Sequence, residues 1–139
     1  MPSPDAPLTG SCACGEVAFE VTSPFDTAGY CHCKRCQRRS GALWSLNAMV
    51  PSHAFAIVRG EEAVRTWTPS DGLPKAFCAS CGGHLYSDGG EVRGVRLGAV
   101  DGDPGIRPEW HQWVESAADW EAIPDDGLPR FPRSRHEDA

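Results

Sequence analysis

The sequence predicts a single, mainly β domain, and three observations support this fold class. The 139 residues contain 15 glycines and 12 prolines spread along the chain, which divide it into short segments and disfavour long helices. Apolar residues alternate with others over residues 17–22, with the period of a half-buried strand. The other apolar runs have the length of strands. A chain of this size fits one domain with a real core.

The predicted strands follow one another through the first hundred residues. Val17, Phe19 and Val21 share one face of the alternating segment and are expected to point into the core. The other expected strands are 43–50, 55–58, 64–67, 84–86 and 92–100. Residues 68–74 read as a plain loop, and short helical turns are expected between the strands.

An aromatic-rich segment follows residue 105 and contains Trp110, Trp113 and Trp120. Large aromatic side chains dominate core burial, so we expect these tryptophans to serve in packing.

Composition and charge exclude several classes of protein. No apolar run approaches the roughly 20 residues that a membrane span requires. The first residues show neither a basic region nor an apolar region of a signal peptide, so a cytoplasmic location is expected. The net charge of −6 argues against a nucleic-acid partner, because such proteins carry basic surfaces.

Seven cysteines are the strongest chemical signal in the sequence. In a reducing compartment thiols stay reduced, so these residues indicate metal ligands or reactive groups before disulfides. Their odd number points the same way. The cysteines fall into three clusters, which are Cys12 with Cys14, then Cys31, Cys33 and Cys36, then Cys78 with Cys81.

The first and last clusters predict one closed zinc site. A Cys-x-x-Cys turn lets two sulfurs converge on one ion, and Gly82 can take the positive φ that follows such a turn. Cys12 and Cys14 supply the natural second pair. A tetrahedral four-cysteine site of this kind stabilises the fold itself.

The central cluster offers three thiolates within six residues. Three protein ligands and one open position are typical of a catalytic zinc, at which a thiol substrate is held as thiolate. A histidine can instead complete the site and make it structural, and the candidates are His32, His53, His84 and His111. His111 is also the one histidine considered as a general acid.

A basic cluster is interleaved with the central cysteines and consists of Lys34, Arg35, Arg38 and Arg39. These side chains can offset the charge of the metal–thiolate cluster and grip the carboxylates of a thiol substrate. The alternative is a solvated turn with ordinary surface charge.

The motifs GSCACGEV (10–17), CHCKRC (31–36) and FCASCG (77–82) resemble the glutathione-dependent formaldehyde-activating enzyme (GFA) family, which includes centromere protein V. The resemblance extends to the segment DGLPRF at 126–131. It implies a β-tent fold of antiparallel sheets around a structural zinc. It also implies two zinc ions, one held by the outer cysteine pairs and a catalytic one held by the central cluster.

The family resemblance further implies a carbon–sulfur lyase that condenses glutathione with formaldehyde, or acts on a related thiol–carbonyl pair. Residues 8–132 would form the zinc domain, with residues 1–7 as an extension and 133–139 as a charged, frayed tail. The oligomeric state is not predicted.

Two other functions are compatible with a cysteine-rich β domain of this kind. In a non-enzymatic zinc-binding or adaptor module, both metals would be structural. A methionine sulfoxide reductase of the B type needs a reactive cysteine on a late strand, and no cysteine follows Cys81. The knuckle-like pairs favour zinc over an iron–sulfur cluster.

Overall fold

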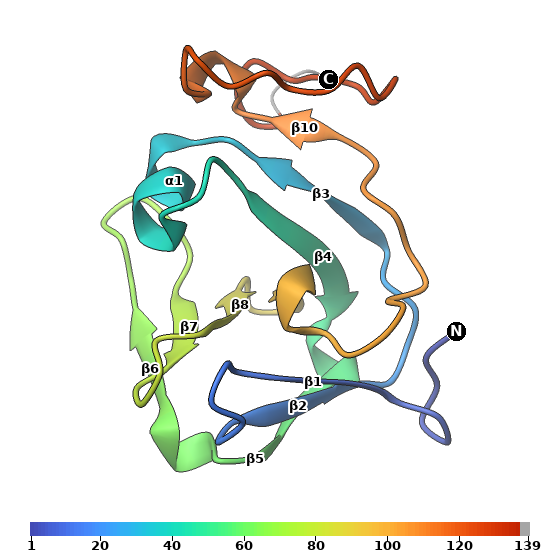
Figure 1. Cartoon of the computed structure of the whole chain (residues 1–139). Helices are drawn as coiled ribbons and strands as arrows, with labels where there is room; N and C mark the ends of the chain where they lie inside the picture. Colours follow the sequence, from blue (N-terminus) through green and yellow to red (C-terminus); the bar gives the residue numbers. More distant parts are fainter. Residues whose placement is uncertain (137–139) are drawn as a thin grey trace.

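A small antiparallel sheet forms the base of the fold, in a computed structural model that describes residues 1–136. Its strands are β1 (Leu8–Ser11), β2 (Ala18–Val21) and β5 (Phe55–Arg59), in the order β1-β2-β5. Figure 1 shows this sheet at the bottom of the molecule, with β3 and β4 above it. The alternating segment behaves as predicted, since Val17, Phe19 and Val21 are fully buried.

A larger sheet of seven strands carries the rest of the chain, in the order β10-β3-β4-β9-β8-β7-β6. Its strands are β3 (Thr27–Cys31), β4 (Ser45–Pro51), β6 (Val64–Trp67), β7 (Lys75–Cys78), β8 (His84–Asp88), β9 (Val92–Arg96) and β10 (His111–Gln112). The mainly β fold class is therefore confirmed. The strand pairs are antiparallel as expected, except at one edge, where the two-residue strand β10 runs parallel to β3.

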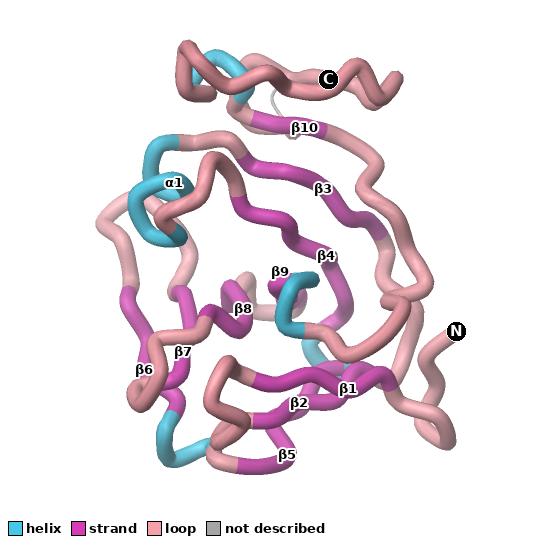
Figure 2. The backbone as a smooth tube through the Cα atoms, in the orientation of Figure 1, coloured by secondary structure: helices cyan, strands magenta, loops and turns pink. Residues whose placement is uncertain are grey.

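Helical structure is limited to short segments, as the glycine and proline content predicted (Figure 2). The helix α1 (Lys34–Ser40) ends at Gly41, which adopts a left-handed conformation with φ of 72°. Single 3-10 turns are η1 (Ser52–Ala54), η2 (Glu61–Ala63), η3 (Leu97–Ala99) and η4 (Val114–Ser116). No helix in residues 1–136 is long and apolar enough to cross a membrane.

The strand predicted over 92–100 is shorter in the structure. β9 ends at Arg96 and the chain turns through η3, after which Val100 forms a bridge with Gly10 of β1. The chain therefore leaves the large sheet to reach the small one. Both sheets contribute to one core, in which the rings of Phe19 and Phe55 lie 5.2 Å apart.

The C-terminal segment, defined as residues 109–136, packs back along β3 at the top of Figure 1. Trp110 is buried against Gly29, where an added Cβ would lie 2.2 Å from the indole ring. Its predicted role in packing is confirmed. Trp120 is 76% exposed, so the same prediction is wrong for this residue. It lies beyond the strands, where no other element covers the ring.

The predicted tail begins in contact with the rest of the chain. The amide of Arg135 donates to Gln112 Oε1 at 3.1 Å, and its guanidinium lies 4.7 Å from the ring of Trp110. Residues 137–139 of that predicted tail lie outside the described residues.

Candidate metal centres and the adjoining cleft

The two outer cysteine pairs meet in one cluster. The sulfurs of Cys12, Cys14, Cys78 and Cys81 all lie within 4.8 Å of one another, with Cys12–Cys14 at 3.6 Å and Cys14–Cys78 at 3.9 Å. Four sulfurs around a zinc ion at about 2.3 Å would be about 3.8 Å apart in a tetrahedron, so this donor set fits the ion. We call these four residues the closed cluster.

Tight turns bring these sulfurs together. Gly15 and Gly82 have φ of 82° and 75°, and their amides donate to the carbonyls of Cys12 and Cys78, which closes each turn. Other amides point at the sulfurs themselves. Hydrogen bonds from the backbone amides of Cys14 and then Gly83 lower the pKa of Cys81 to about 6. The backbone is therefore arranged to stabilise thiolates.

The central cysteines form a second cluster, which we call the open cluster. The sulfurs of Cys31, Cys33 and Cys36 lie within 4.8 Å of one another. Cys31 ends β3, and Cys33 caps the N-terminus of α1 by accepting the Cys36 amide at 3.3 Å. The short sequence between strand and helix is therefore what brings three sulfurs to one point.

Hydrogen bonds concentrate negative charge on Cys36. Donation from Cys31 and Cys33, and a 3.2 Å bond from the hydroxyl of Ser45, lower the pKa of Cys36 to about 2. The same contacts with Cys33 and Cys36 raise the pKa of Cys31. Asn47 Nδ2 donates in turn to Ser45 Oγ at 3.0 Å.

No histidine or carboxylate within residues 1–136 joins the three sulfurs of the open cluster. His32 and His111 bond to each other instead, with His32 Nε2 and His111 Nδ1 2.9 Å apart. Glu121 and Asp126 complete the chain, at 3.3 Å from His32 Nδ1 and 2.8 Å from His111 Nε2.

This polar chain, which is buried at His32 and His111 and reaches the surface at Asp126, fastens the C-terminal segment to the loop after β3. Sequence reasoning missed Glu121, which follows His32 by 89 residues with no motif to link the two. It noted Asp126 only as part of the segment 126–131 and gave it no role in a site. The ring of His111 stacks on Tyr30 at 4.7 Å. The other two histidines considered as ligands lie elsewhere, with His84 lining a different hollow and His53 in η1.

The open cluster faces a cleft of about 840 Å³. Of the four predicted substrate contacts, Lys34 and Arg35 line this cleft, and Arg35 also lines an adjoining hollow together with Arg38 and Arg39. An ion pair between Arg35 and Asp71, at 2.6 Å, separates the two. The structure therefore divides the basic cluster between two surfaces.

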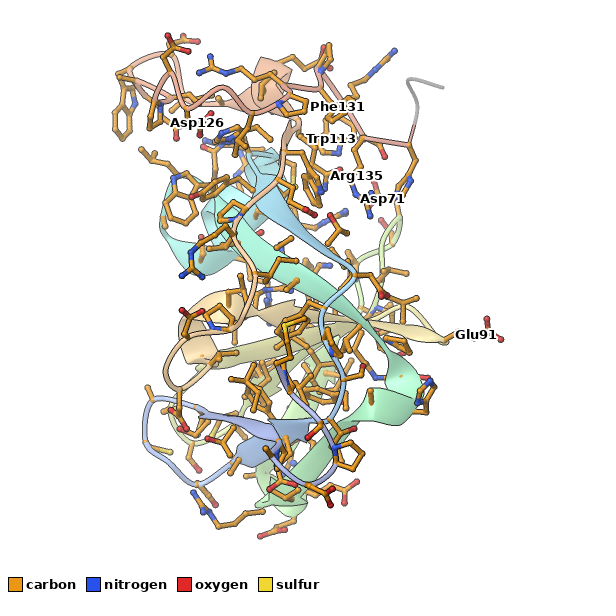
Figure 3. The ribbon with its side chains drawn as sticks, turned by 90° about the vertical axis from the view of Figure 1, so that its right-hand side faces the viewer. Asp71, Glu91, Trp113, Asp126, Phe131 and Arg135 are labelled. Atoms are coloured by element: carbon orange, nitrogen blue, oxygen red, sulfur yellow. The ribbon has the colours of Figure 1, made fainter. Side chains whose placement is uncertain are left out.

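The cleft also contains residues that the sequence did not single out. They come from β4, β7, β8 and β9, and they are Ser45, Asn47, Lys75, Ser87 and Arg96. The C-terminal segment supplies another wall through Trp113 and Arg135, which Figure 3 labels together with Asp71. Polar residues inside the apolar strand run 43–50 were the available signal for Ser45 and Asn47.

These features define a class of small β proteins with one four-cysteine cluster and one three-cysteine cluster that opens on a cleft. The family model described as "Glutathione-dependent formaldehyde-activating enzyme" matches residues 7–116. The chain belongs to this GFA family, which confirms the resemblance read from the motifs.

Curated relatives agree with this assignment. A protein of Sordaria macrospora named "Putative glutathione-dependent formaldehyde-activating enzyme" is 28% identical over 89 residues, which cover 60% of this chain and 38% of that protein. One of Emericella nidulans with the same name is 25% identical over 83 residues, covering 60% of this chain and 42% of that protein. The matched region therefore spans about two fifths of these relatives.

A solved structure supports the fold. The crystal structure of a Rhodobacter sphaeroides protein superposes with a TM-score of 0.58 and 23% identity, over 88% of this chain and 98% of that one. At this identity the likeness concerns the fold alone.

Proposed function

We propose that this chain is a zinc-dependent carbon–sulfur lyase that acts on a thiol–aldehyde adduct, formed from glutathione and formaldehyde or from a related thiol and carbonyl. The observation that carries the proposal is the open cluster, whose three sulfurs face a cleft and gain no fourth ligand from residues 1–136. Family membership supports the reaction class.

Two zinc ions fit the two donor sets. Cys12, Cys14, Cys78 and Cys81 would hold the structural ion, and Cys31, Cys33 and Cys36 the catalytic one. Thiolate ligands suit zinc, and the paired cysteine turns favour it over iron. A zinc ion with an open position supplies Lewis acidity that keeps a bound thiol deprotonated at neutral pH.

The chain's own residues position the reacting groups. Lys34 and Arg35 lie at the cleft and can bind carboxylates of a peptide-like thiol, while Arg38 and Arg39 would act from the neighbouring hollow. In the condensation an S–C bond forms, the carbonyl π bond breaks, and its oxygen takes a proton from solvent in the cleft. The reverse step returns thiol and aldehyde. His111 is itself buried and both of its ring nitrogens are engaged in the polar chain, so we assign it no proton transfer.

We also propose that the protein is located in the cytoplasm. All seven cysteines are free in the structure, as a reducing cytoplasm would keep them. The proposed partner is a small-molecule thiol, and the net charge of −6 disfavours nucleic acid. We propose that the zinc domain spans residues 8–132.

The test compares wild type with Cys33→Ser in zinc content and in turnover of the glutathione–formaldehyde adduct, followed by NMR exchange. Cys33→Ser is expected to lose one of two zinc ions and to bring turnover to the spontaneous rate. Loss of the ion with no change in turnover would exclude the enzyme. X-ray absorption showing four protein ligands at both metals would instead support a non-enzymatic zinc-binding or adaptor module.

A further inference from the structure

Three polar residues on adjacent strands form part of the cleft floor. In the sheet register Lys75 of β7 pairs with Ser87 of β8, and Ser87 pairs with Gly94 of β9. Arg96 lies two residues beyond Gly94 and so on the same face of the sheet. All three side chains line the cleft together with the open cluster.

Hydrogen bonds tie the two cations to one hydroxyl. Lys75 Nζ donates to Ser87 Oγ at 3.3 Å, and Arg96 Nη2 donates to the same oxygen at 3.0 Å. Because both bonds use the lone pairs of the oxygen, the Ser87 hydroxyl proton is free to be donated to another acceptor. The group therefore presents only donors and positive charge.

Neither cation has a carboxylate partner within residues 1–136, although both are partly removed from solvent. Arg96 Nε is buried without a hydrogen-bond partner. Burial, followed by the charge of Arg39, lowers the pKa of Arg96 to about 10, and burial together with Arg96 lowers the pKa of Lys75. Buried cations without counter-charge are costly, so an anion is expected beside them.

The thiolates of the open cluster do not supply enough negative charge. Three thiolates with one divalent ion carry a net charge of about −1. Lys75 and Arg96, which both line the cleft, together carry two positive charges close to Cys36. A surplus of positive charge therefore remains in the cleft even when the metal is bound.

We infer that Lys75, Ser87 and Arg96 form an oxyanion-binding subsite in the cleft. Its ligand is an oxygen with negative charge close to the reacting sulfur, because the cations lie near Cys36. Two sources share this chemistry, a carboxylate a few bonds from the thiol and the oxygen of the carbonyl as it becomes an alkoxide. The second source rests on the proposed lyase function, whereas the first does not.

Binding is measured by calorimetry on the zinc-loaded full chain. The probes are 3-mercaptopropionate and the neutral 3-mercapto-1-propanol, which differ only in the carboxylate. Wild type is expected to prefer the acid by at least about tenfold, the usual effect of charge-assisted hydrogen bonds. Lys75→Gln and Ser87→Ala are expected to remove most of this preference. Arg96→Lys, which keeps the charge, is expected to retain part of it.

Arg107→Gln is the matched control, because it removes one positive charge at an exposed ion pair with Asp103. It is expected to leave the preference unchanged, and a loss equal to that of Lys75→Gln would overturn the subsite. Equal binding of both thiols to wild type, with a lower kcat but unchanged KM in Lys75→Gln, would assign the subsite to the carbonyl oxygen.

Equal binding together with unchanged kinetics would overturn the subsite altogether. A wild type that shows the preference but no adduct turnover would keep the subsite and reject the lyase. Near-UV circular dichroism of each variant establishes that the fold is retained.

Discussion

At the scale of single residues, Cys36 is held by a short relay of hydrogen bonds. Asn47 donates to Ser45, and Ser45 donates to the sulfur of Cys36. These two polar residues belong to β4, which crosses the large sheet beside β3. Hydrogen-bond partners of this kind orient metal ligands, and their removal lowers the affinity for the metal.

Ser45→Ala removes the donor to Cys36 and is expected to weaken zinc binding at the open cluster by about tenfold, the lower end of the effect of such partners. Competition with a chromophoric chelator measures the affinity. Ser116→Ala is the control, because Ser116 lines the same cleft and its side chain bonds to none of the sulfurs. Equal affinity of Ser45→Ala and wild type would contradict the orienting role.

The sequence identified every cysteine of both clusters, since their spacing alone indicates metal ligands. It did not identify Lys75, Ser87 and Arg96, which are separated along the chain and are joined only by strand register. It grouped Arg38 and Arg39 with Arg35, and all three line one hollow, but only Arg35 of these three also lines the cleft. Motifs of neighbouring residues could be recognised in the sequence, whereas contacts between residues on different strands of a sheet could not.

At the scale of elements, the C-terminal segment packs against β3 at a point where the two backbones come close together, at Gly29 and Trp110. Gly29 of β3 has no side chain, and the indole of Trp110 occupies that space. The contact lies beside the parallel pairing of β10 with β3, a strand direction that the sequence did not indicate. Hydrophobic patterning carries no information on strand direction for a two-residue strand.

Gly29→Ala is expected to destabilise the fold by about 3 kcal/mol, because the new Cβ would overlap the Trp110 ring. Gly98→Ala is the matched control, since an added Cβ there meets nothing within 4 Å, and its effect is expected to stay within about 0.5 kcal/mol. Urea denaturation measures both changes. Equal stability of the two variants would contradict the packing described for Trp110.

The polar chain of His32, His111, Glu121 and Asp126 predicts a pH-dependent stability. The hydrogen bond from His111, followed by the Leu128 amide, lowers the pKa of Asp126 below its ordinary value. A carboxylate with a depressed pKa in the folded state stabilises the protein above its ordinary pKa, and this contribution is lost as the pH falls through the folded value. Asp126 therefore contributes at neutral pH and little in acid.

Asp126→Asn is accordingly expected to lower Tm at about pH 6, and the difference from wild type is expected to narrow toward about pH 3. Thermal unfolding followed by circular dichroism at several pH values measures this. Asp125→Asn, at an exposed neighbouring position, is expected to show no such trend. A Tm difference that stays constant with pH would argue against a charged contact at Asp126.

At the scale of the whole molecule, the closed cluster joins parts of the chain that are distant in sequence. Cys14 and Cys78 are 64 positions apart, and their sulfurs lie 3.9 Å from each other. The open cluster, in contrast, lies within six consecutive residues. We therefore expect the two clusters to differ in how strongly they stabilise the fold.

Cys81→Ser is expected to cost more than about 3 kcal/mol of stability and to abolish one zinc ion, because a structural zinc contributes directly to folding. Cys33→Ser is expected to lose the other ion and to keep the folded spectrum. Metal analysis and chemical denaturation compare the two. Similar stability of both variants would show that the closed cluster is not the structural one.

The sequence was sufficient to predict a mainly β fold, but not the order of the strands in the large sheet. Short apolar runs and frequent glycine indicated strands, and the order of motifs indicated the family. The seven-stranded order of the large sheet was not predictable, because β4 pairs with β9 across more than forty residues. The end of β9 at Arg96 was not predictable for the same reason, because it depends on the contact of Val100 with Gly10, which is distant in sequence.

The different sequence spans of the two clusters have a consequence for assembly during synthesis. The three sulfurs of the open cluster leave the ribosome almost together, long before Cys78 and Cys81. Closing a short loop costs less conformational entropy than closing a long one, so the open cluster can gather its sulfurs in a nascent chain. The closed cluster cannot form until Cys78 and Cys81, in the second half of the chain, have been synthesised. The order in which the two clusters become able to take up metal is thus the reverse of the importance that we expect them to have for the finished fold.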